Sequence, residues 1–118
     1  MRILFILGFI TLLPACDMCG NQIISETPSP DLRQKIVVFE RSCGATTGFS
    51  NHISILDINE ELANEPGNIF IADGHHDENL PKVIWKSEDQ LEISYTNNGD
   101  VYKKESSLKD VAILFSAL

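Results

Sequence analysis

The sequence predicts a small all-β domain, an antiparallel meander of six to seven strands arranged as a sandwich or open barrel, behind an N-terminal signal segment. Two observations predict this class. After residue 31 the apolar runs are short, rich in β-branched and aromatic residues, and separated by turn signals about every ten residues. Residues 90–96 also alternate cleanly, which places Leu91, Ile93 and Tyr95 on one face, as in a sheet with one face in water.

The first fifteen residues have the features of an export signal. Arg2 precedes an apolar run over residues 3–13, which is too short for a membrane-spanning helix of about 20 residues. The following Leu13-Pro14-Ala15-Cys16 resembles the lipobox of bacterial lipoproteins, although Pro14 departs from the usual small residue at its position. The resemblance implies cleavage before Cys16, a lipid on its thiol, and a protein anchored on the outer side of the cytoplasmic membrane. Ordinary cleavage that leaves a free cysteine is the alternative.

Residues 16–31 are polar and contain Pro28 and Pro30, so we expect a linker there and the β domain at residues 32–118. With Cys16 bearing lipid, Cys19 and Cys43 are the two remaining thiols. Exported proteins live where disulfides persist, which favours a bridge between this pair. Free thiols or an intermolecular bridge are the alternatives.

The individual elements follow from local patterns. Residues 35–41, 52–58, 68–73, 82–86, 90–96, 101–104 and 111–115 are the expected strands. The last run is compatible with a short helix, but its Val, Ile and Phe content favours a strand. Residues 59–65 predict a helical turn ended by Pro66-Gly67, and the Asn-Gly pair within residues 97–100 predicts a tight hairpin.

The charge of the chain limits its partners. The whole sequence has 9 basic and 17 acidic residues. Removal of residues 1–15 takes only Arg2 from this count, which leaves a formal charge of −9. Binding to nucleic acid or directly to anionic lipid needs a basic surface, so neither is expected. We expect contact with the membrane through the lipid anchor, together with an envelope protein partner.

Residues 43–48 hold the most distinctive loop. Gly44, Thr46, Thr47 and Gly48 expose backbone amides and hydroxyls that suit an anion or a partner. Cys43 beside them would be a nucleophile if a base such as His52 reached it. The simpler interpretation is a turn whose glycines serve the backbone geometry and whose cysteine is oxidised.

A second polar loop contains His75, His76 and Asp77, with Asp73 or His52 as further ligands for a divalent ion. Adjacent histidines on an extended chain point to opposite sides, so they seldom serve the same ion. We therefore interpret this loop as solvated charge and expect neither a metal site nor a cofactor.

Residues 39–50, with the sequence FERSCGATTGFS, resemble a signature of small, uncharacterised bacterial exported proteins and lipoproteins. The resemblance extends over roughly residues 29–100 and includes the strand at 52–56 and the phrase Gly67-Asn68-Ile69-Phe70. It implies an envelope protein but brings no known activity.

These patterns lead to three functional hypotheses. The first is a lipid-anchored binding or structural module of the envelope without catalytic activity. The second is an acidic inhibitor that captures a cationic exported enzyme, as lipoprotein inhibitors of lysozyme do. The third is a small thiol enzyme that uses Cys43 and His52.

Overall fold

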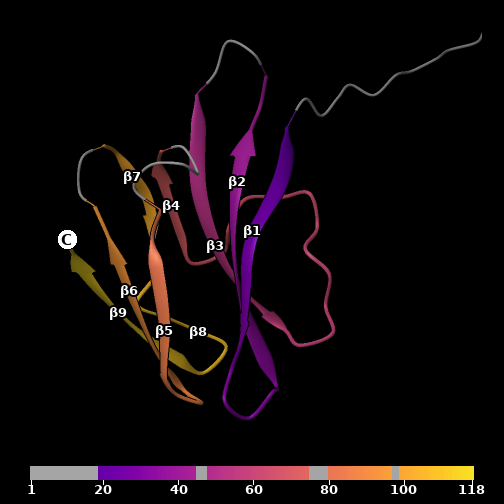
Figure 1. Ribbon diagram of the computed structural model, residues 1–118, viewed down its shortest axis with the longest axis vertical. Coiled ribbons are helices and arrows are strands. Elements are labelled where there is room, and N and C mark those ends of the chain that lie inside the picture. Colours follow the sequence, from indigo (N-terminus) through magenta and orange to yellow (C-terminus); the bar gives the residue numbers. More distant parts are fainter. Residues whose placement is uncertain (1–18, 45–47, 75–79, 97–98) are drawn as a thin grey trace, which may run out of the picture.

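The computed structural model describes residues 19–44, 48–74, 80–96 and 99–118, which form two β-sheets packed face to face (Figure 1). Within these ranges, no helix is long and apolar enough to cross a membrane. The all-β class is confirmed. The nine strands are Gly20–Pro28 (β1), Gln34–Ser42 (β2), Phe49–Asp57 (β3), Phe70–Asp73 (β4), Lys82–Ser87 (β5), Gln90–Tyr95 (β6), Val101–Lys104 (β7), Ser107–Leu108 (β8) and Val111–Ala117 (β9).

The topology is a sandwich in which the chain changes sheets three times. Strands β1-β2-β3-β4-β7 form the five-stranded sheet, and β5-β6-β9-β8 form the four-stranded sheet. All neighbouring pairs are antiparallel except β6 and β9, which run parallel. The expected meander therefore holds for β1 to β4, and the later strands alternate between sheets.

The prediction of a linker is wrong for residues 20–28, because these residues form β1. This strand pairs with β2 from Gly20 opposite Ser42 to Pro28 opposite Lys35, with a bulge between Ile23 and Ser25. Most of its residues are exposed or half-buried. A strand at the edge of a sheet can be held by backbone hydrogen bonds to one neighbour, and that pairing leaves little apolar periodicity in the sequence.

Two further expectations are wrong. Residues 59–65 form no helical turn. They belong to an irregular segment, residues 58–69, which we call the strap because it lies across the outer face of the five-stranded sheet (the pink segment beside β1 in Figure 1). The expected hairpin between β6 and β7 is also not formed, because β6 pairs with β5 and β9 whereas β7 pairs with β4. Asn97 and Asn98 themselves lie outside the described residues.

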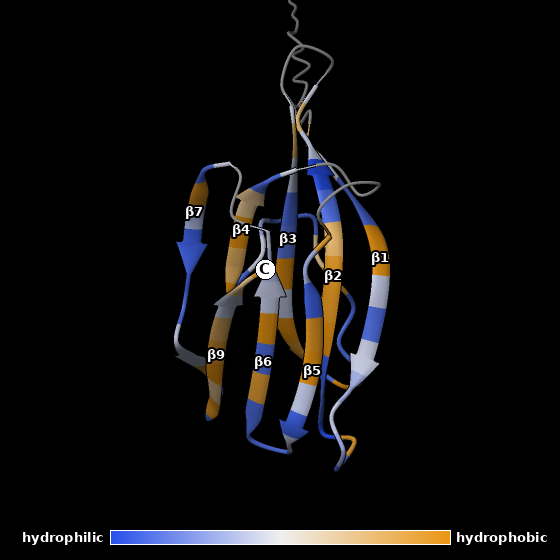
Figure 2. Ribbon diagram, turned by 60° about the vertical axis from the view of Figure 1, so that its left-hand side comes forward, coloured by the Kyte–Doolittle hydropathy of each residue, from blue (hydrophilic) through white to orange (hydrophobic). Residues whose placement is uncertain are grey.

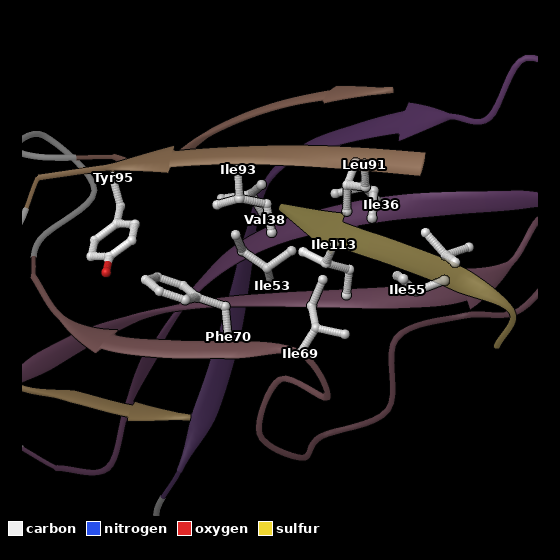
Figure 3. Packing of buried hydrophobic residues seen from close by; sticks show 11 residues of the cluster. Ile36, Val38, Ile53, Ile55, Ile69, Phe70, Leu91, Ile93, Tyr95 and Ile113 are labelled. Atoms are coloured by element: carbon white, nitrogen blue, oxygen red, sulfur yellow. The ribbon is translucent and has the colours of Figure 1, made fainter. Parts of the chain in front are cut away.

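The main core lies between the two sheets. The alternation predicted for β6 is confirmed, since Leu91 and Ile93 are fully buried and Tyr95 is 8% exposed. Figure 2 shows the matching hydrophobic and hydrophilic bands along β6. Side chains from both sheets point toward one another in this core, as Figure 3 shows. Its buried members are Ile36, Val38, Ile53, Ile55, Ile69, Phe70, Leu91, Ile93, Tyr95, Val111 and Ile113.

A second, smaller core lies on the opposite face of the five-stranded sheet. Val37, Phe39 and Leu56 are buried there, and Leu62 of the strap packs against them. The five-stranded sheet is thus covered on both faces, by the other sheet on one side and by the strap on the other.

Candidate functional site

Cys19 and Cys43 form a disulfide. Cys19 immediately precedes β1 and Cys43 immediately follows β2, so the bridge continues the ladder one position beyond the Gly20–Ser42 pair. It closes the end of the sandwich at which β1 begins. A sulfur held in this bridge has no thiolate to offer, and the oxidised protein therefore cannot use Cys43 as a nucleophile.

His52 is unsuited to the base role that the thiol-enzyme hypothesis gave it. The Gly67 amide donates to its Nδ1 at 2.9 Å, which places the ring proton on Nε2. Nε2 then donates to Ser50 Oγ at 2.8 Å, so this nitrogen cannot accept a proton from the serine. The side chain is 3% exposed, and burial, followed by the charges of Arg41 and Lys103, lowers its pKa to about 4. The His52 ring is neutral and links Gly67 to Ser50 by hydrogen bonds.

The glycine-rich loop is described only at its two ends. Gly44 has a φ of 130°, a left-handed value that favours glycine. Gly48 has open space around the position of a side chain. Thr46 and Thr47 lie outside the described residues, as do Cys16 and the loop with His75, His76 and Asp77. The lipid, anion and metal interpretations of those residues remain predictions.

Asp73, considered above as a further metal ligand, contacts β7 and the turn before it. Its carboxylate accepts hydrogen bonds from the Tyr102 hydroxyl at 3.0 Å and from the Asp100 amide at 3.3 Å. This contact raises the pKa of Tyr102. Among the described residues, no group of three or more His, Cys, Asp or Glu side chains is arranged to hold a metal ion.

A cavity of about 470 Å³ opens at the other end of the sandwich, among the strand connections. We call it the turn-end cavity. The β1–β2 turn, the end of β3, the β5–β6 turn and the β8–β9 turn meet around it. Because β1 runs from Gly20, next to Cys19, to the β1–β2 turn, its nine residues separate the disulfide from this cavity by about 30 Å. The two ends are visible in Figure 1, with the start of β1 at the top.

The turn-end cavity is predominantly acidic. Its cationic side chains are Arg33 and Lys109, and Lys109 Nζ lies 3.5 Å from Asp57 Oδ1. The Ser29 hydroxyl donates to Asp31 at 2.7 Å and lowers the pKa of that carboxyl group, which keeps it ionised. The carboxylates outnumber the cations, being Asp31, Asp57, Glu88, Asp89 and Asp110.

Positive φ values at residues other than glycine occur around the same cavity. Leu32, Lys109 and Asp110 have φ values of 59°, 51° and 64°, and they are the non-glycine residues with positive φ in the described part of the chain. Leu32 lies between two cavity-lining residues and is 64% exposed, whereas Lys109 and Asp110 line the cavity directly. Lys109 and Asp110 are the two loop residues of the β8–β9 hairpin, in which Leu108 pairs with Val111, and a tight two-residue turn takes positive φ at both positions. Leu32 lies in the longer β1–β2 loop, where its left-handed conformation carries the steric cost usual for residues other than glycine.

Sequence reasoning missed the turn-end cavity because its members are far apart in the chain. Glu88 and Asp89 appear as a solvated turn, and Asp31 appears as the end of a linker. The available signal was topological, since every second connection in an antiparallel arrangement lies at the same end. Using that signal requires knowing that residues 20–28 are a strand.

Comparison with protein-family models, with curated proteins and with solved structures finds no match to this chain.

Proposed function

We propose that the protein is exported, anchored to the membrane by a lipid on Cys16, and acts as a binding module that engages a cationic partner through the turn-end cavity. The observation that carries this proposal is a cavity lined by five carboxylates and two cations, with the exposed, left-handed Leu32 beside it. A cavity of one dominant charge attracts partners of the opposite charge, which suits recognition.

The position of the cavity supports the same proposal. A lipid on Cys16 would attach the protein three residues before Cys19, at the end of the sandwich remote from the cavity. The acidic end would then face away from the anionic membrane surface, where a partner can approach it. The disulfide limits the free tether to about 10 Å, by the reach of three extended residues.

An acidic inhibitor of a cationic exported enzyme is the more specific candidate. Leu32 favours it, because an exposed apolar side chain beside a charged cavity resembles the apolar anchor and polar rim of a protein interface. Lysozyme is a suitable probe because its surface is cationic.

Calorimetric titration of the protein with lysozyme, and separately with an oligolysine peptide, tests this proposal. The double variant Glu88→Gln/Asp89→Asn removes two cavity carboxylates, and Glu61→Gln/Glu105→Gln removes two exposed carboxylates elsewhere. We expect the cavity variant to bind at least tenfold more weakly and the matched control to stay within about twofold. Binding should weaken as salt is added.

Equal losses in the two variants would mean that the net charge, and not the turn-end cavity, attracts the probes. Oligolysine binding without lysozyme binding would reject lysozyme as the target but support an acidic site for cationic partners. Binding of neither probe would contradict the proposal.

A further inference from the structure

The strap is held in place through the first residues of β1. The Asn64 side-chain amide donates to the Cys19 carbonyl at 3.0 Å. The Asn21 amide donates to the carbonyls of Ala63 at 3.1 Å and Glu65 at 3.0 Å. The middle of the strap is therefore fastened to two residues at the start of an edge strand.

Arg41 of β2 links the two asparagines. Its Nη1 donates to Asn21 Oδ1 at 2.8 Å and to Asn64 Oδ1 at 2.9 Å. One guanidinium thus orients both side chains, which places their amide groups toward the strap and toward Cys19. We call Asn21, Arg41 and Asn64 the latch.

The latch depends on a short piece of ladder that has little burial of its own. β1 is an edge strand, and residues Gly20 to Ile23 pair with β2 between the disulfide at one end and the bulge after Ile23 at the other. Gly20 is exposed and Ile23 is 47% exposed. A bulge disrupts the ladder, so this piece can separate without the rest of β1. The disulfide holds the free end of this piece to β2, together with the ladder and the Arg41–Asn21 hydrogen bond.

The strap covers apolar surface. Leu62 packs against Val37 and Phe39, both fully buried, and a small cavity of about 90 Å³ lies beneath the strap beside Ser54 and Pro66. Separation of residues 19–23 would remove the acceptor at Cys19 and the donor at Asn21. The Arg41–Asn64 hydrogen bond would remain, but the three bonds from the strap to Cys19 and Asn21 would be lost, and Leu62 could then leave its contacts and expose this surface.

We propose that Cys19–Cys43 is a redox-sensitive switch for the strap, which is closed when the disulfide is formed and open when it is reduced. The reductant is a dithiol, such as the active site of a thiol–disulfide oxidoreductase. One of its thiolates attacks a sulfur of the bridge, and its second thiol resolves the mixed disulfide. The Cys19–Cys43 bond breaks, both cysteines become thiols, and the dithiol becomes a disulfide after the transfer of two electrons and two protons.

Hydrogen exchange of the full chain, measured by mass spectrometry before and after treatment with dithiothreitol, tests this switch. The informative amides are those of residues 60–65, where the Glu65 amide donates to the Ala63 carbonyl in the closed strap; Pro66 has no amide hydrogen. We expect exchange there to accelerate at least tenfold on reduction, while the amides of β6 and β9 in the core change less than twofold.

The variant Asn21→Ala/Asn64→Ala tests the contribution of the latch while the disulfide stays formed. It should exchange at least tenfold faster than the wild type over residues 60–65 with the disulfide intact, and reduction should add less than threefold. The matched control Ser94→Ala/Ser116→Ala removes a hydroxyl pair from the four-stranded sheet and should leave the strap unchanged.

Two results would overturn the switch. One is unchanged exchange over residues 60–65 after reduction. The other is equal acceleration in the strap and in β6, or global unfolding, because the disulfide would then stabilise the whole domain without acting on the strap. A failure of cation binding at the turn-end cavity would leave this test unaffected.

Discussion

The two sheets of the sandwich differ in their outer faces. The strap covers the five-stranded sheet, where Val37 and Phe39 are fully buried. The four-stranded sheet has no such cover in the described chain, and Ile84 and Leu114 on its outer side are 53% and 65% exposed. The first sheet is therefore an inner layer although it belongs to a two-sheet fold.

An irregular segment can cover a sheet only where its backbone polar groups find partners. β3 has nine residues but β4 has only four, so the far half of β3 has no neighbouring strand on that side. The strap supplies the missing partners through Asn68, which bonds both the amide and the carbonyl of Ile55, and through Ile69, whose amide donates to Ile53. Buried His52 and Ser54 accept the next two strap amides.

Asn68→Ala should have the largest effect on the covered face. It removes bonds of 2.8 Å and 2.9 Å to the backbone of the fully buried Ile55 and leaves both groups without their partner. We expect the free energy of unfolding to fall by about 3 kcal/mol. Urea unfolding followed by Trp85 fluorescence measures the change. Asn59→Ala, at an exposed asparagine of the same strap, should change it by less than about 0.5 kcal/mol; similar losses in both variants would contradict the role assigned to Asn68.

His52 should make the covered face sensitive to acid. Its pKa falls from the ordinary 6.5 to about 4 in the folded protein, so the unfolded chain binds the extra proton between these values. The stability due to the neutral ring is complete above about pH 6.5 and is lost as the pH falls toward 4, by an amount on the order of 3 kcal/mol.

His52→Gln keeps a donor and an acceptor but does not titrate. The difference in unfolding free energy between the wild type and His52→Gln should therefore vary with pH across this window. The titration of the carboxylates is common to both proteins and cancels from that difference. A difference that is constant from pH 4 to 6.5 would show that His52 titrates normally.

Gly67→Ala tests how closely the strap approaches β3. A Cβ at this position would lie 2.8 Å and 2.9 Å from the backbone oxygen and nitrogen of Ile53 and 3.0 Å from the backbone oxygen of Phe70. Backbone atoms cannot move aside as a flexible side chain can, so we expect a loss of about 2 kcal/mol. Gly20→Ala, where nothing lies within 4 Å, is the control and should be nearly neutral. Equal stability of the two variants would mean that the strap is not closely packed.

The smallest expected losses of stability compare one leucine on each outer face of the sandwich. Leu62→Ala removes a side chain packed on the covered face and should cost about 1.5 kcal/mol. Leu114→Ala removes the same groups from the open face, and at 65% exposure it should cost less than about 0.5 kcal/mol. Comparable losses in thermal or urea unfolding would contradict the distinction between the faces.

The sequence predicts the parts of this fold that depend on local periodicity. Residues 90–95 alternate and form β6 as expected, and the Val and Ile content of residues 111–115 correctly favours a strand. The expected compartment and the cysteine count favoured a Cys19–Cys43 disulfide over free thiols or an intermolecular bridge, and the disulfide is present. The strap and β1 were not predicted, because their stability comes from bonds to distant residues such as Asn64 to Cys19. The turn-end cavity was missed for the same reason, since Asp31 and Asp110 meet only in the folded chain.

The proposed account depends on a membrane anchor at one end and an acidic site for a cationic partner at the other, and a lipid on Cys16 would set which end faces the membrane. Intact mass of the protein extracted from membranes, before and after alkylation without reductant, is the most direct test. The account predicts a chain that begins at Cys16, carries acyl groups on it, and gains no mass from alkylation. A retained N-terminal segment or an unmodified, alkylatable Cys16 would contradict it.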